Sequence, residues 1–154
     1  MDAAAMTFAD ESFEFVYSMA VFQHLEDPAA VLDEMIRVLT PGGGLYLDFI
    51  LYTSPYGSHD ARLFDGSEDA LPAWAHLQPE LQPFVRPNAH LNRLRLPEWR
   101  ALCEDRMPGS EILLIEASGR GLADEARTLR QQVLRDYALD ELTTSKVIVL
   151  WRKP

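Results

Sequence analysis

The sequence has one cysteine, few basic residues and no long apolar run. Cys103 is the single cysteine among 154 residues, which excludes an intrachain disulfide and a cluster of thiolate ligands. No uninterrupted apolar stretch reaches the roughly 18 residues that a membrane-spanning helix needs. Lysine and arginine number 14 against 24 acidic residues, giving a formal net charge of -10. Because so acidic a chain has no general attraction to phosphate backbones or anionic lipids, we expect neither nucleic acid nor a membrane as a partner.

The charge is also unevenly distributed along the chain. Eight carboxylates and no lysine or arginine precede Arg37, which is the reverse of a secretory or organellar targeting segment. A chain of 154 residues is long enough for one domain with its own core. We therefore expect a single globular domain in the cytoplasm.

The N-terminal third predicts a strand, a helix and a second strand. Phe13–Met19 is short, aromatic and β-branched with apolar residues on both faces, as in a strand buried on both sides. Asp27 and Pro28 are typical of a helix N-cap and first helical position. Residues 40–44, Thr-Pro-Gly-Gly-Gly, are expected to end the helix, and residues 45–51 to form the next strand. This order predicts a βαβ unit with a parallel strand pair.

The rest of the chain predicts two further parts of the same domain. Residues 1–52 are the βαβ core, and residues 53–96 carry frequent prolines and scattered aromatics. Proline at this frequency forbids long regular elements, so we expect a loop-rich, lid-like insertion with short helical turns over the sheet. Residues 97–154 predict a helix, a strand, an amphipathic helix from Leu122 to Tyr137 and a last strand.

Three segments of this sequence resemble a known family. They are DAAAMTFADESFEFVYS (residues 2–18), VFQHLEDP (21–28) and EMIRVLTPGGG (34–44). They are similar to the approach to the fourth strand, the next helix and the glycine turn of class I S-adenosylmethionine-dependent methyltransferases, closest to the small-molecule subgroup. The resemblance is specific up to residue 51 and loose afterwards. It implies an α/β fold made of the distal strands of a Rossmann-like sheet, with the last strand antiparallel.

The resemblance also implies a function and a set of site residues. The function is methyl transfer from the cofactor S-adenosylmethionine to a small-molecule acceptor. The expected cofactor-binding residues are Asp2, Ala3, Ser18, Met19, Ala20 and Gln23. Asp2 matches an acid that accepts a hydrogen bond from the adenine amine, and the others lie at or beyond the carboxyl end of a strand, where α/β ligands bind.

His24 is the candidate general base, which an acceptor hydroxyl or protonated amine requires. The alternative is that His24 merely packs against its own loop. No metal site is expected. Asp48 lies inside an apolar strand, and it either points into the acceptor cleft or simply reaches the end of the strand.

The family features that bind the ribose and the rest of the cofactor are expected upstream of Asp2. These features are a glycine-rich turn and a ribose-binding acid. Because only Met1 precedes Asp2 in this sequence, we expect both to be missing from it, which should weaken cofactor binding by roughly 4–8 kcal/mol. The Phe13–Met19 strand would then present an open apolar edge for a second copy or a partner chain. The alternative function is a non-catalytic half-domain that binds a partner through this edge.

Residues of the insertion and nearby loops allow two interpretations each. His59, His76 and His90 are expected to be solvated loop histidines rather than metal ligands. Three aromatic residues either line an acceptor pocket or cover the sheet, and three arginines either attract an anionic acceptor or form a solvated basic edge. These are Tyr56, Trp74 and Phe84, and Arg86, Arg93 and Arg95.

Overall fold

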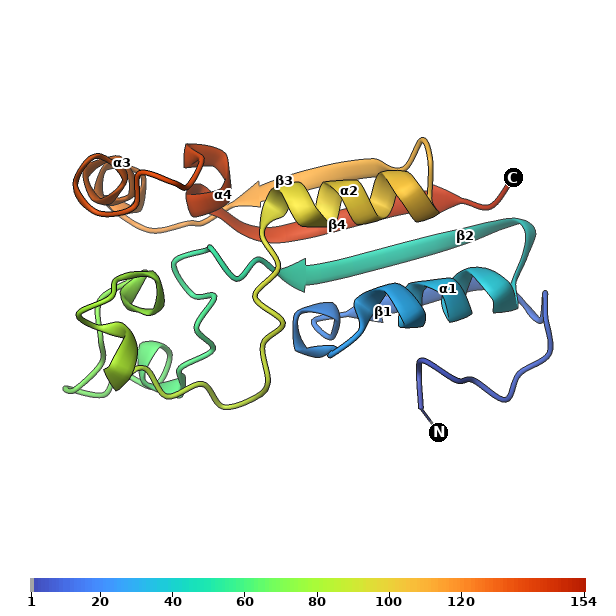
Figure 1. Ribbon diagram of the computed structural model, residues 1–154, viewed down its shortest axis with the longest axis horizontal. Coiled ribbons are helices and arrows are strands. Elements are labelled where there is room, and N and C mark those ends of the chain that lie inside the picture. Colours follow the sequence, from blue (N-terminus) through green and yellow to red (C-terminus); the bar gives the residue numbers. More distant parts are fainter. Residues whose placement is uncertain (1) are drawn as a thin grey trace.

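The computed structural model describes residues 2–154 as a four-stranded sheet with two helices on one face (Figure 1). The first three elements are β1 (Phe13–Met19), α1 (Pro28–Val38) and β2 (Leu39–Ile50), and β1 pairs with β2 in parallel. The predicted βαβ unit is therefore confirmed. Met1 lies outside the described residues.

The C-terminal part completes the sheet. Its elements are α2 (Leu96–Arg106), β3 (Glu111–Glu116), α3 (Leu122–Gln132), α4 (Leu139–Thr143) and β4 (Thr144–Arg152). The strand order is β1-β2-β4-β3, and β4 is antiparallel to both of its neighbours. The α/β class and the antiparallel last strand are as expected.

Helix α1 begins where the sequence predicted. The Asp27 carboxylate accepts a hydrogen bond from the backbone N–H of Ala30 at 3.0 Å, and Pro28 is the first helical residue. The helix ends earlier than its glycine turn, at Val38, so the prediction that residues 40–44 end it is wrong. These residues start β2 instead, because Gly42 donates a backbone hydrogen bond to Lys153 beyond the end of β4.

The helix predicted from Leu122 to Tyr137 is also shorter than expected. α3 ends at Gln132, and Tyr137 lies in a loop before α4. The reason is tertiary, because the chain turns after α3 and buries Leu134 in a small cluster with Trp74, Ala126 and Leu142. Helical periodicity alone does not show this turn.

One face of the sheet is covered by α1 and α2 (Figure 1). Alternate residues of β2 and β4 point to this face and are almost fully buried; they are Leu45, Leu47 and Phe49, and Val147 and Val149. Leu32 of α1 and Trp99 of α2 pack onto them. Burial of these side chains is the main stabilising contribution to the sheet.

The opposite face has no helix on it in the described chain. Phe15, Tyr17 and Met19 of β1 are 59%, 64% and 56% exposed, although the sequence predicted a strand buried on both faces. The cross-strand register places Leu113 and Ile115 of β3 on the same face, and they too are exposed. We call Phe15, Tyr17, Met19, Leu113, Ile115 and Leu150 the uncovered face.

The position of β1 accounts for part of this exposure. Within residues 2–154, β1 is one of the two edge strands of the sheet and pairs with β2 alone, so the predicted open edge is confirmed. The prediction of a doubly buried strand is wrong because no second layer packs on β1 among residues 2–154.

The insertion lies beyond the carboxyl ends of β1 and β2 rather than over the sheet (Figure 1). As the proline content predicted, its only helices are three single turns, Ala61–Leu63, Ala75–Leu77 and Gln82–Phe84. Asp60, which is 3% exposed, ties two parts of it together by accepting hydrogen bonds from the Arg62 side chain at 2.6 Å and the Arg86 backbone at 2.8 Å. The Arg62 guanidinium lowers the pKa of Asp60 to about 2. No helix in residues 2–154 is both long and apolar enough to cross a membrane.

Candidate functional site

The turn after β1 is fixed by a buried carboxylate from β2. Ala20 has a left-handed φ of 54°, and its N–H donates to the backbone oxygen of Asp48 at 2.8 Å and to its carboxylate at 3.1 Å. The same carboxylate accepts from the Tyr46 hydroxyl at 3.2 Å and from Lys146 at 3.3 Å. Asp48 is 2% exposed, so it finds partners at the strand end and does not open into a cleft.

The next loop positions His24 through Gln23. The Gln23 amide nitrogen donates to the Ala20 carbonyl at 3.0 Å and lies 3.2 Å from His24 Nε2. His24 Nδ1 lies 2.8 Å from the His90 carbonyl oxygen. Because a carbonyl oxygen only accepts, Nδ1 carries the proton, and in the neutral ring Nε2 accepts from Gln23. The imidazole is therefore held in one tautomer with its basic nitrogen directed toward Gln23.

A segment of the insertion closes over this loop. The side-chain amide of Asn92 donates to the backbone oxygens of Phe22 at 2.7 Å and Leu25 at 3.2 Å. The Asn92 backbone N–H donates to the Gln23 carbonyl at 3.0 Å. We call residues 88–95 the strap. Sequence reasoning missed Asn92, since no local pattern connects it to a loop so far away in the chain.

A second imidazole lies against the first. The ring centroids of His24 and His59 are 4.7 Å apart and the planes meet at 76°. His59 Nε2 and Gln23 Oε1 are buried and have no hydrogen-bond partner among the described residues. Burial, and then the neighbouring His24, lower the pKa of His59. His59 is therefore neutral at neutral pH, with a nitrogen that lacks a partner.

The expectation of solvated histidines is wrong for two of the three residues. His59 is partly buried, and His76 is 3% exposed with its Nε2–H donating to the Tyr52 carbonyl at 2.7 Å. Burial lowers the pKa of His76 to about 4. His90 is exposed. The insertion folds into its own small interior, which a proline-rich composition does not reveal.

The structure groups most, but not all, of the expected site residues. Ser18 and Met19 end β1, Ala20 follows it, and Gln23 and His24 lie in the adjoining turn. Asp2 and Ala3 are exposed, and the contacts found for Asp2 lie within its own turn, with Ala4 and Ala5. A role for Asp2 and Ala3 in cofactor binding stays a prediction from the resemblance.

The aromatic and basic residues of the insertion have separate roles. Trp74 is 1% exposed and donates to the Leu142 carbonyl at 3.1 Å, so it packs on α3 and α4 rather than on the sheet. Phe84 is 62% exposed. Arg95 forms an ion pair with the buried Glu141 and stacks on Tyr137 at 4.4 Å from the ring centroid. Arg93 lines a cavity, which is described below.

The turn after β1 leaves one buried acceptor oxygen unpaired among the described residues. Among residues 2–154 no group of three or more metal-ligating side chains lies together. The unpartnered Gln23 Oε1, beside the left-handed turn at Ala20, suits a ligand donor such as an ammonium group. No glycine-rich turn follows β1 or β2. The described residues of this turn thus offer an unpaired acceptor oxygen at the end of β1.

Comparison with known proteins points to one family. Residues 1–47 match the family model described as a methyltransferase domain. An uncharacterized methyltransferase of Mycolicibacterium vanbaalenii is 37% identical over 59 residues, which are 38% of this chain and 23% of that protein. One of Mycobacterium tuberculosis is 36% identical over 59 residues and is covered to the same 23%.

Solved structures extend the likeness to the fold. A Mesorhizobium loti S-adenosylmethionine-dependent methyltransferase matches with a TM-score of 0.55 at 16% identity, over 99% of this chain and 67% of that one. Haemonchus contortus phosphoethanolamine N-methyltransferase 2, in complex with S-adenosyl-L-methionine, matches with a TM-score of 0.56 at 15% identity, over 99% and 36%. The chain resembles the class I methyltransferases.

This methyltransferase resemblance has a defined extent. The sequence match covers the first third of the chain, and the fold match covers nearly all of it. The matched segment spans about a quarter of the length of the curated relatives.

Proposed function

We propose that this chain forms part of a site that transfers the methyl group of S-adenosylmethionine to a small molecule. The observation that carries the proposal is the strand order β1-β2-β4-β3, with one parallel and two antiparallel pairs. The segment with the methyltransferase sequence match runs through β1 and α1 into β2 of this sheet. Ligands of such sheets bind beyond the carboxyl ends of the parallel strands, where Ala20, Gln23 and His24 lie.

In the proposed reaction, the protein mainly aligns the methyl donor and the acceptor and shields them from water. Bound cofactor supplies an activated methyl group, and displacement at that carbon needs aligned, desolvated partners. The backbone of Ser18, Met19 and Ala20 lines the methionine end, and Gln23 holds the turn. If the acceptor is a hydroxyl or a protonated amine, its proton passes to His24 Nε2 in place of the Gln23 hydrogen bond, or to His59 beside it.

Residue-resolved binding of S-adenosylhomocysteine tests this proposal. We expect saturable amide chemical-shift changes in residues 18–24, with a dissociation constant in the millimolar range or weaker because the proposed contacts of residues 18–24 involve one end of the cofactor. Amides of α1 away from this end are the internal control. No change at any concentration overturns the cofactor proposal, and micromolar binding overturns the assignment of one end of the cofactor alone.

A second candidate function is a half-domain that binds another chain through its sheet edge. The observation that favours it is that β1 has one neighbour and exposes Phe15 and Tyr17. The partner is either a second copy or a different chain. One solved neighbour, with a TM-score of 0.52 at 18% identity over 60% of its length, is a methyltransferase in complex with the Haloferax volcanii Trm112 activator.

Light scattering at increasing concentration separates these partners. A concentration-dependent dimer that Tyr17→Lys abolishes supports a second copy. A monomer at all concentrations rejects self-association and leaves a different chain as the partner of this edge. The cytoplasmic location expected from the charge distribution stays a prediction.

A further inference from the structure

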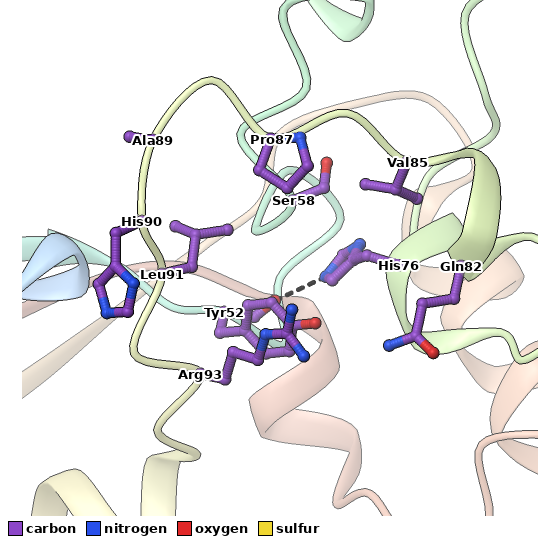
Figure 2. Close-up of a pocket in the computed structure, with 10 residues that line it drawn as sticks. All are labelled: Tyr52, Ser58, His76, Gln82, Val85, Pro87, Ala89, His90, Leu91 and Arg93. Carbon is purple, nitrogen blue, oxygen red and sulfur yellow. Dashed lines mark hydrogen bonds between the residues drawn. The ribbon is translucent and has the colours of Figure 1, made fainter. Parts of the chain in front are cut away.

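A cavity of about 360 Å³ lies inside the insertion, next to the strap (Figure 2). Its volume lies at the lower end of the range for small-molecule sites. Tyr52, just after β2, forms its floor in this view, and His76 and His90 stand on opposite sides. The carbonyl of His90 accepts the hydrogen bond from His24 at 2.8 Å, so the cavity adjoins the candidate base.

The cavity has a single permanent charge. Arg93 is the one lysine, arginine or carboxylate among the described residues that line it. The Arg93 guanidinium carbon lies 5.9 Å from the centroid of the Tyr52 ring, and no carboxylate pairs with it in the described chain. By contrast, Arg62 and Arg95 are each paired with a buried carboxylate. In a chain of net charge -10, an unpaired arginine at a cavity marks a local positive potential.

The remaining walls are largely apolar or uncharged. His76 is neutral at neutral pH because burial lowers its pKa to about 4, and one ring N–H is committed to the Tyr52 carbonyl (Figure 2). Val85 and Leu91 add aliphatic surface. The cavity therefore has space for a ring-sized apolar group, and the guanidinium of Arg93 supplies one positive charge at its edge.

We propose that this cavity binds an acceptor with a ring-sized apolar body and an anionic group, a carboxylate or a phosphate, that Arg93 holds. A guanidinium forms paired hydrogen bonds with either anion, so the two share one recognition chemistry. The role of the bound molecule as methyl acceptor rests on the proposed function. Its binding does not, because the cavity is formed entirely by this chain.

Three matched ligands test the cavity by amide chemical shifts of the chain alone. They are 4-hydroxybenzoate, phenyl phosphate and the neutral 4-hydroxybenzamide. We expect saturable shifts at the amides of Tyr52, His76 and Arg93 with at least one anion, and about tenfold weaker binding of the benzamide. The tighter of the two anions identifies the anionic group. Failure of both anions, or equal binding of the benzamide, overturns the proposal.

Variants of two exposed arginines locate the charge. Arg93→Gln should weaken anion binding about tenfold, and Arg93→Lys should restore most of it. Arg86→Gln is the control, because Arg86 is also an exposed arginine of the insertion and does not line the cavity. An unchanged affinity in Arg93→Gln contradicts the proposal. If Arg93→Gln does not fold, the comparison of anion and benzamide in the unsubstituted chain still decides.

The outcomes also separate this inference from the proposed function. Anion binding through Arg93, with no S-adenosylhomocysteine shifts in residues 18–24, keeps the cavity and rejects methyl transfer. Shifts in residues 18–24 without anion binding reject the cavity alone.

Discussion

The two faces of the sheet are built from similar residues and differ in what covers them. Leu47 and Phe49 on one face are 2% and 1% exposed, whereas Tyr17 and Met19 on the other are 64% and 56% exposed. The two strands read alike in sequence, and the difference arises from α1 and α2, which pack on one side only. An apolar strand pattern therefore reports that a face is suited to burial, and the elements present decide whether it is buried.

The largest expected effect comes from truncating one aromatic on each face. Phe49→Ala should lower the free energy of unfolding by about 3–5 kcal/mol, since the ring packs against Trp99 at a centroid distance of 4.3 Å. Tyr17→Ala, the matched control, should change it by less than about 0.5 kcal/mol. Urea denaturation measures both. Equal losses would show that both faces are buried in the folded chain and would break the comparison.

Lowering the pH should destabilise the chain through a histidine of the insertion rather than through residues on either face of the sheet. The pKa of His76 is lowered from 6.5 to about 4, so the unfolded chain binds more protons between these values. The free energy of unfolding should therefore fall as the pH drops from about 6.5 to 4, by on the order of 2–3 kcal/mol from this residue. His76→Gln, which keeps an amide donor for the Tyr52 carbonyl, should flatten this dependence. If the free energy of unfolding of His76→Gln depends on pH as strongly as that of the unsubstituted chain, other groups cause the dependence.

The smallest expected effect concerns the helix that covers one face. Asp27→Ala removes the cap acceptor for the Ala30 N–H and should cost about 1 kcal/mol. Asp27→Ser, which keeps a cap acceptor, is the control and should cost less. Thermal unfolding followed by circular dichroism measures both variants. Equal losses in both would show that the cap hydrogen bond is not what Asp27 contributes.

The parts that sequence predicted correctly depend on local signals. The Asp27–Pro28 start of α1 and the apolar spacing that follows it lie within a few turns of chain. The site was only partly predictable, because its contacts join distant segments. His24 meets His90 across 66 positions, and Arg95 meets Glu141 across 46. The contact between the His24 and His59 rings depends on the same folding of the insertion, and no spacing in the sequence predicts that contact.

The oxidation rate of individual methionines tests the uncovered face most directly. Met19 lies on that face, and Met35 and Met107 lie in the covered core at 3% and 0% exposure. In the dilute chain treated with hydrogen peroxide, mass spectrometry should find Met19 oxidised at a rate close to that of free methionine, and Met35 and Met107 protected. Protection of Met19 equal to that of Met35 in the dilute chain would contradict the account, because it would show that this chain covers both faces of its sheet.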